Sequence, residues 1–183
     1  FKNVIVLGHV QDQFGQKMSK SKGNAISPFE ALEKYGADPI RWYFLSNSAP
    51  WLPNKFYDKA VLDGQRRFLG TLYNTYAFYV LYADIYQFDP TKHPLEQSAL
   101  TVMDRWILSR LNSLVEVLSN WYVRRSRERF WRDELDADSF AAFTTLYTCL
   151  STLSRAAAPM IPFMTEEIYQ NVVRTVDTNA PES

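Results

Sequence analysis

The pattern of apolar positions predicts a short strand and a polar loop at the start of the chain. Residues 3–7 are mostly β-branched and apolar, and Gly8 ends the run. Such a run, bounded by glycine, is typical of a buried strand. Residues 11–24 are polar and include Gly15, Gly23 and three lysines, a composition that favours a mobile loop.

Two short helices are predicted after this loop. Ser27 is placed to cap the first helix, Pro28 fits its first position, and Glu30 would complete a capping box. A glycine at position 36 is placed to end this helix. Asp38 is placed to cap a second helix that Pro39 opens.

From about residue 57 onward, apolar residues recur at helical spacing. Val61, Phe68, Leu72 and Tyr76 follow one another at intervals of seven and four residues. Residues 87–94 interrupt the pattern. Further helices are expected over residues 100–117, 118–132 and 139–158 and from Pro162 onward, with Leu72, Leu111, Leu146 and Leu150 buried.

These elements predict a mainly α fold. A bundle of four or five helices is expected to follow a small strand-loop-helix unit. We expect the first domain to span residues 1–55, the helical bundle residues 56–175, and a disordered tail residues 176–183.

Composition excludes several classes of protein. Apolar residues make up 46% of the 183 residues, enough for a core, and the formal net charge of zero argues against a wholly basic nucleic-acid binder. Cys149 is the single cysteine, so no disulfide within the chain and no multi-cysteine zinc site is expected. We interpret it as an inert core thiol in a reducing cytoplasm. No apolar run is long enough to span a bilayer.

The strongest chemical signal is the pair Lys17 and Lys20 in the polar loop. Two lysines three residues apart can bring two ammonium groups around one polyphosphate, and lysine is a mobile point charge that can follow a moving phosphate. Ser19 and Ser21 add hydroxyl donors. The alternative is a solvated surface loop, which is the commoner meaning of a lysine-rich segment.

A second candidate site is the basic, aromatic segment over residues 121–132. Arg124, Arg125 and Arg127 could hold phosphates through bidentate contacts, and Trp121 could stack on an unpaired base. In the alternative reading the aromatic residues belong to the core, and the arginines pair with nearby acidic residues such as Glu128, Asp133 and Glu134.

Four segments resemble class I aminoacyl-tRNA synthetases. Residues 17–21, read as Lys-Met-Ser-Lys-Ser and continued by Lys-Gly-Asn, resemble the signature loop of that family. Residues 35–43 resemble the helical unit that follows this loop. The segments 119–131 and 158–169 resemble the isoleucyl branch. The valyl branch has a segment similar to residues 162–167 and remains an alternative.

The resemblance implies that the parent protein activates isoleucine with ATP and magnesium and transfers it to tRNA. Lys17 and Lys20 would be catalytic, stabilising charge on the departing pyrophosphate. The ATP site would also include His9, Met18, Ser19 and Ser21, although a lone histidine is more often structural. The helical bundle would be the anticodon-binding domain, and Trp121, Arg124, Arg125 and Arg127 would contact the tRNA.

The resemblance also implies that this chain is one segment of a longer, monomeric, cytoplasmic enzyme. Phe1 is not an initiator methionine, and the segment lacks the upstream ATP motif and the amino-acid pocket of the family. We therefore expect the segment alone to be inactive as a ligase and to have no metal site. Alone, it could still act as a non-catalytic tRNA-binding module.

One departure from the family lies between Val117 and Leu118. The family has a helix end, a turn and a second helix between the segments that meet at this point. Either the protein carries a deletion or the sequence omits a stretch of residues. We favour an omission, because losing a helix of the bundle would expose the apolar faces of its neighbours.

Overall fold

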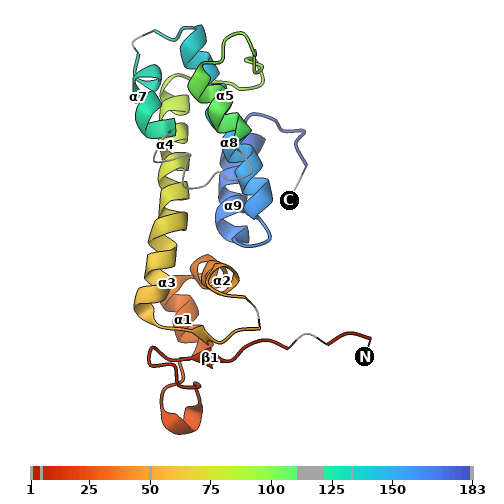
Figure 1. Cartoon of the computed structure of the whole chain (residues 1–183). Coiled ribbons are helices and arrows are strands. Elements are labelled where there is room, and N and C mark those ends of the chain that lie inside the picture. Colours follow the sequence, from red (N-terminus) through yellow and green to blue (C-terminus); the bar gives the residue numbers. More distant parts are fainter. Residues whose placement is uncertain (1, 5, 50, 111–121, 133, 182–183) are drawn as a thin grey trace. The chain divides into compact units, whose positions relative to one another are not determined.

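The structure is a computed structural model that describes residues 2–4, 6–49, 51–110, 122–132 and 134–181. It divides into two compact units, Phe1–Leu69 and Gly70–Ser183, whose elements are labelled in Figure 1. The division falls later than the boundary expected at residues 55–56.

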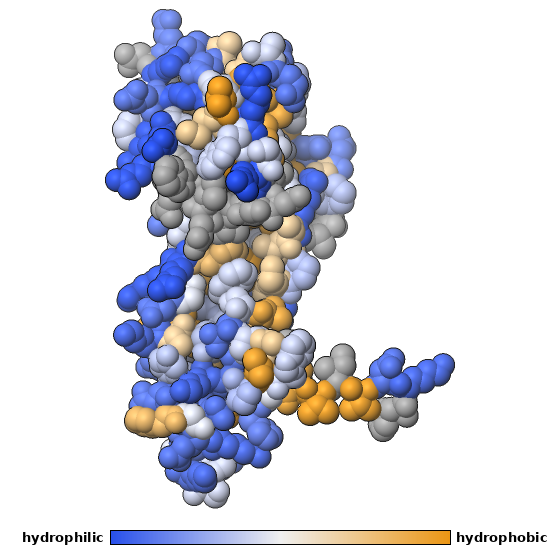
Figure 2. All heavy atoms as spheres, viewed as in Figure 1, coloured by the Kyte–Doolittle hydropathy of each residue, from blue (hydrophilic) through white to orange (hydrophobic). Residues whose placement is uncertain are grey.

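The first unit contains a two-stranded parallel sheet. Strand β1 (Val10–Gln11) pairs with β2 (Asn54–Lys55), with Val10 opposite Asn54. The buried strand predicted over residues 3–7 is wrong for the described residues of that segment, because they adopt no regular structure. Figure 2 shows this segment as a strip of hydrophobic atoms, and the exposed fractions of Val4 and Val6 are 71% and 75%. A strand needs a neighbour for its backbone groups, and β2 supplies one at Val10–Gln11 instead.

Two helices follow the loop, much as the sequence predicts. Helix α1 (Pro28–Tyr35) begins at the expected proline and ends at Gly36, whose φ is 81°. The predicted capping box is wrong, because the Ser27 side chain makes no capping hydrogen bond. Helix α2 (Ala37–Ser46) begins before Asp38, which lies inside the first turn and does not cap it. Pro39 is tolerated there because the first N–H groups of a helix have no intrahelical acceptor.

The core of the first unit joins α1 and α2 to helix α3 (Asp58–Gly64). The Phe56 ring packs edge-on against Tyr35, with centroids 6.2 Å apart, and stacks on Phe44 at 5.4 Å. Val61 of α3 is completely buried in the same cluster. Residues beyond 55 therefore belong to this core, which explains the later boundary. A π-helical turn, η2 (Gln65–Gly70), follows α3.

The second unit is helical throughout its described regular elements, and this confirms the predicted bundle. Leu72, Leu146 and Leu150 are buried as expected, whereas Leu111 lies outside the described residues. The expected helices over residues 100–117 and 118–132 are described only in part. The elements are α4 (Thr71–Ile85), α5 (Val102–Ser109), α7 (Arg124–Phe130), α8 (Ala137–Ala157), α9 (Pro162–Tyr169) and a π-helical turn, η5 (Gln170–Arg174).

Helix α8 is the centre of the second unit and packs against α4, α5, α7 and α9. Phe143 and Leu146 are completely buried in it, as expected for a central helix. Several buried or half-buried positions of α8 carry hydroxyl groups, and some of these donate to carbonyls of the preceding turn. Ser154 Oγ donates to the Ser151 carbonyl at 3.0 Å, and Thr148 Oγ1 donates to the Thr144 carbonyl at 2.8 Å. These hydroxyls are therefore satisfied without a partner on another helix.

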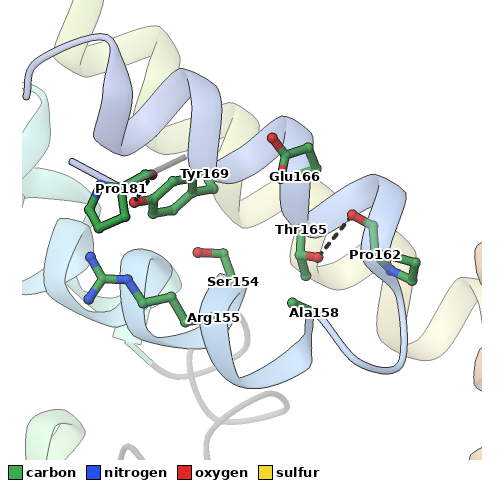
Figure 3. A pocket seen from close by; sticks show the side chains of 8 residues that line it. All are labelled: Ser154, Arg155, Ala158, Pro162, Thr165, Glu166, Tyr169 and Pro181. Atoms are coloured by element: carbon green, nitrogen blue, oxygen red, sulfur yellow. Dashed lines mark hydrogen bonds between the residues drawn. The ribbon is translucent and has the colours of Figure 1, made fainter. Parts of the chain in front are cut away.

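The C-terminal tail folds back onto the bundle as far as Pro181. The Tyr169 hydroxyl donates to the Pro181 carbonyl at 3.0 Å (Figure 3). The described part of the tail expected to be disordered, residues 176–181, therefore contacts the helices. No helix in the described part of the chain is long and apolar enough to cross a membrane.

Candidate functional site

The lysine loop, residues 12–24, starts directly from strand β1. After Gln11 the chain reverses, and Gln11 and Lys17 form an antiparallel bridge. The Met18 N–H donates to the Val10 carbonyl at 3.2 Å. The loop is thus anchored to the strand at both sides of its first turn.

Asp12 shapes this first turn. Its carboxylate Oδ1 accepts the backbone N–H groups of Phe14 at 3.0 Å and Gln16 at 2.9 Å. Gly15 has a φ of 83°, which glycine adopts without the strain that a side chain would bring. A hydrogen bond from Asn24, followed by those from backbone amides, lowers the pKa of Asp12.

The lysine side chains of the loop are exposed. Lys20 and Lys22 lie on a short 3₁₀ turn, η1 (Lys20–Lys22), which ends at Gly23 with a φ of 68°. Among the described residues, no ion pair involves Lys17, Lys20 or Lys22. Their ammonium groups are therefore available to an anionic ligand. This geometry suits the chemistry expected of Lys17 and Lys20.

The other residues predicted for the ATP site have different surroundings. The Met18 side chain packs against the core cluster of α1, α2 and α3 and so fixes the loop to the first unit. The hydroxyls of Ser19 and Ser21 lie 3.2 Å apart. His9 is exposed directly before β1, and its carbonyl accepts the Asn54 N–H at 3.0 Å. The structure therefore places Lys17 at the bridge to Gln11, Lys20 and Ser21 on the 3₁₀ turn, and His9 at the root of the loop.

Asn24 was not among the predicted site residues, yet its side chain bridges the loop. Its Oδ1 accepts the Ser19 N–H at 3.0 Å, and its Nδ2 donates to Asp12 Oδ2 at 2.9 Å. The available signal was an asparagine directly after Gly23, a pair typical of a turn. The partner twelve residues earlier has no signature in the sequence.

The arginines predicted to bind RNA all lie in helix α7. Arg124, Arg125 and Arg127 are all exposed. The Arg127 guanidinium lies 5.8 Å from the centroid of the Trp131 ring, and this ring is 51% exposed. Trp121, the fourth predicted residue of this site, lies outside the described residues.

Arg125 also borders a groove at the start of α5. The groove is lined by Thr101, Val102, Met103 and Trp106 in addition to Arg125, and its volume is about 630 Å³. The exposed cations of α7 therefore lie close to an indole ring and to apolar side chains, the kind of surface that suits both phosphates and bases.

Arg129, on the same helix, has a structural role instead. Its guanidinium makes two hydrogen bonds to the buried Asp104 carboxylate, at 2.7 and 2.8 Å, and its Nε donates to Asp138 at 3.0 Å. Arg132 pairs with Asp136 and Asp138. Arg129 and Arg132 therefore pair with acidic residues, as the alternative reading supposes, but among the described residues their partners are Asp104, Asp136 and Asp138 and not the acidic residues proposed for them.

The Asp104 carboxylate is the centre of this buried network. Burial raises its pKa, but hydrogen bonds from Arg129, Tyr122 and Thr101 outweigh that effect, and the net shift is downward. The Tyr122 hydroxyl donates to Asp104 Oδ1 at 2.6 Å, and burial raises the pKa of that tyrosine. Through Asp104, the network ties α7 to α5 and fixes the direction in which α7 presents its outer face.

A cavity beside α9 contains none of the predicted site residues. It has a volume of about 660 Å³ and lies between α8, α9 and the tail (Figure 3). Its charged residues are Arg155, which lies 5.7 Å from the Tyr169 ring centroid, and Glu166. Among the described residues, no group of three or more histidine, cysteine, aspartate or glutamate side chains could hold a metal ion.

Two family models match the chain. Residues 1–52 match the class I tRNA synthetases of the I, L, M and V group, and residues 107–183 match the anticodon-binding domain of tRNA ligase. The first match includes the whole lysine loop, and the second includes α7, α8 and α9. The sequence resemblance at both candidate sites is therefore supported independently.

Curated relatives match the entire chain. An isoleucine–tRNA ligase of Clostridium kluyveri is 52% identical over 206 aligned positions, covering 100% of this chain and 20% of the relative. Relatives with the same name from Clostridium tetani and Dehalococcoides mccartyi are 50% and 47% identical, with the same coverage. The chain therefore spans about a fifth of the length of these relatives.

These alignments also bear on the expected missing stretch. Because 206 positions are aligned with 183 residues, at least 23 aligned positions have no counterpart in this chain. This agrees with the expected absence of residues relative to the family. The place proposed for it, between Val117 and Leu118, lies outside the described residues.

Solved structures support the fold. A LeuRS of Agrobacterium radiobacter, in a ternary complex with tRNA and LeuAMS, superposes on this chain with a TM-score of 0.63 at 22% identity. The match covers 91% of this chain and 22% of the LeuRS chain. The Mycobacterium tuberculosis methionyl-tRNA synthetase, in complex with methionyl-adenylate, has a TM-score of 0.65 at 18% identity, with coverages of 93% and 40%. Both solved structures share the fold, and the family models and the curated relatives show that the chain belongs to the class I aminoacyl-tRNA synthetases and is homologous to a segment of isoleucine–tRNA ligase.

Proposed function

We propose that this chain is the part of an isoleucine–tRNA ligase that contacts the phosphates of ATP and docks tRNA. The observation that carries the proposal is the 52% identity over the whole chain to a curated ligase of that name, in a chain whose paired lysines are exposed. The complete enzyme activates isoleucine with ATP and transfers it to the isoleucine tRNA in the cytoplasm, as a monomer.

The lysine loop acts in the activation step. The isoleucine carboxylate attacks the α-phosphate of ATP, which forms an aminoacyl-adenylate and releases pyrophosphate. Lys17 and Lys20 stabilise the negative charge that develops on the pyrophosphate. His9, Met18, Ser19 and Ser21 complete the surroundings of ATP. Magnesium accompanies ATP through its phosphate oxygens. The one carboxylate of the loop, Asp12, is engaged with backbone amides and Asn24, so it is poorly placed to be a metal ligand.

The exposed face of α7 acts in tRNA docking. Arg124, Arg125 and Arg127 supply positive charge on one short helix, and arginine suits phosphate oxygens because its donors form a planar fork. Trp121 would add a stacking surface. The family model for an anticodon-binding domain, which covers α7, supports this role.

The isolated chain is expected to bind RNA without catalysing activation. It spans about a fifth of its relatives, so most contacts to isoleucine and adenosine must come from other parts of the enzyme. Exchange between pyrophosphate and ATP that depends on isoleucine should therefore stay at background with the purified chain. Clear exchange would show that the chain carries a complete activation site.

Lys20→Ala in the complete ligase tests the role of the loop. Because the contact strengthens as pyrophosphate leaves, the rate of adenylate formation should fall roughly a hundred- to a thousand-fold, and isoleucine affinity should change little. Lys22→Ala is the matched control, because it removes the same charge from the same turn and should cost far less. Rapid-quench measurement of adenylate decides the matter, and equal, small effects in both variants would refute the proposal.

A further inference from the structure

The side chain of Asn24, at the end of the lysine loop, bonds to the start and to the middle of the loop. Asn24 Oδ1 accepts the Ser19 N–H at 3.0 Å, and Ser19 lies between the two lysines. Its Nδ2 donates to Asp12 Oδ2 at 2.9 Å and lies 3.4 Å from the Lys17 carbonyl. A single amide therefore reaches the start of the loop, the first lysine and the residue before the second lysine.

The bonding pattern fixes the orientation of the Asn24 amide. The carboxylate of Asp12 can only accept, and the Ser19 backbone N–H can only donate. Turning the amide over would set its oxygen against the carboxylate and its NH₂ group against the N–H, which would break both bonds. The bridge therefore needs one carboxylate facing one amide, with an acceptor oxygen at position 24 facing the Ser19 N–H.

The same pattern engages both carboxylate oxygens of Asp12 in hydrogen bonds to groups other than the lysines. Its Oδ1 accepts two backbone N–H groups, and its Oδ2 accepts the Asn24 amide. Among the described residues, no ion pair joins Asp12 to Lys17 or Lys20. The Asp12 carboxylate is thus engaged with two backbone N–H groups and the Asn24 amide. Both lysine ammonium groups therefore remain available to phosphate.

We propose that the Asn24–Asp12 hydrogen bond is a positioning element for the lysine loop, which holds Lys17 and Lys20 at a fixed separation before ATP binds. This inference rests on the proposed function. Groups held in place beforehand stabilise a transition state better than groups that must first be ordered, because little reorganisation remains at the moment of reaction. Neither Asn24 nor Asp12 needs to touch ATP for this effect.

A reciprocal exchange of the two residues provides the test. Asn24→Asp sets two carboxylates against each other, and Asp12→Asn sets two NH₂ groups against each other. The double variant restores one carboxylate facing one amide, and an aspartate at position 24 can still accept the Ser19 N–H. In the complete ligase, each single variant should lower the rate of adenylate formation about tenfold or more. The double variant should return to within about threefold of the original rate, with ATP affinity changed less than the rate throughout.

Hydrogen exchange of the 183-residue chain reports the bridge without any catalysis. The Ser19 amide should exchange faster in both single variants and slow down again in the double variant. Asn3→Asp is the matched control, because it makes the same chemical change on the exposed N-terminal segment and should alter neither the Ser19 amide nor the rate.

The outcomes separate the two proposals. If Lys20→Ala lowers the rate and the single variants at positions 12 and 24 do not, the positioning role is refuted. If the single variants lower the rate and the double variant fails to recover, the hydrogen bond is not the cause, and the inference is likewise refuted. If Lys20→Ala itself has no effect, the proposed function fails, and the exchange of the Ser19 amide still shows whether the bridge forms.

Discussion

Replacing Arg129 by alanine should destabilise the second unit more than any other arginine substitution on α7. Arg129 makes two hydrogen bonds to the Asp104 carboxylate, and the Asp104 side chain is completely buried. Removing the guanidinium leaves a buried charge whose remaining hydrogen bonds, among the described residues, come from Tyr122 and Thr101. Breaking one partner of such a pair typically costs about 3–5 kcal/mol of unfolding free energy.

The pH dependence of this loss follows from the pKa of Asp104. In the original protein that pKa is lowered on folding, so the carboxylate contributes stability above its unfolded pKa and loses it as the pH falls. Without Arg129, the effect of burial dominates and the pKa of Asp104 in the folded variant rises above its unfolded value. Lowering the pH from 7 then protonates Asp104, and the variant becomes more stable than it is at pH 7. The difference between the two proteins should therefore shrink from pH 7 towards pH 4.

Urea unfolding followed by circular dichroism at several pH values measures both effects. Arg124→Ala is the control, because Arg124 is exposed on the same helix and its loss should change stability by well under about 1 kcal/mol. A loss of under about 1 kcal/mol for Arg129→Ala at pH 7, or a difference that grows as the pH falls, would refute the structural role.

Three further predictions concern RNA, the thiol and the root of the loop. Replacing Arg124, Arg125 and Arg127 together by glutamine should weaken tRNA binding and reduce the slope of log affinity against log salt concentration by about 2–3, as measured by filter binding. An unchanged slope in a folded variant would show that these arginines have a structural role. Burial raises the pKa of Cys149 to about 12, so iodoacetamide at pH 8 should label it only after unfolding, and rapid native labelling would contradict this. Gly8→Ala places a Cβ 2.0 Å from the Leu52 carbonyl oxygen, so it should cost about 1–3 kcal/mol and speed hydrogen exchange at β2, and a neutral effect would show that the close approach relaxes freely.

The helical bundle could be predicted because its signal is local. Leu72, Leu146 and Leu150 repeat at helical spacing, and a helix satisfies its backbone within the same segment. The strand could not be placed in this way, since its position depends on where β2 offers a partner. The expected run at residues 3–7 has the right composition for a strand, but its described residues pair with no neighbouring strand among the described parts of the chain.

In the candidate sites too, features within a short stretch of sequence could be predicted, whereas pairings between distant residues could not. Lys17 and Lys20 could be proposed from the sequence because the chemistry expected of them lies within one short string of residues. Arg129 could not be separated from its neighbours by sequence, because its main partner, Asp104, lies 25 residues earlier. The bridge from Asn24 to Asp12 could not be predicted for the same reason, because the two residues lie twelve positions apart. Pairings over such distances are set by the packing of helices and loops and leave no periodic trace.

The hydroxyl-rich interior of α8 has a consequence for how this unit tolerates sequence change. Because Thr148 and Ser154 bond to carbonyls of their own helix, the outer surface of these side chains is effectively apolar and small. Neighbouring helices therefore select residues at such positions by volume and not by polarity. At these positions of α8, we expect substitutions between polar and apolar residues of similar size to be tolerated and substitutions by larger residues to be rejected. A hydropathy scale alone would therefore not predict which substitutions the bundle accepts.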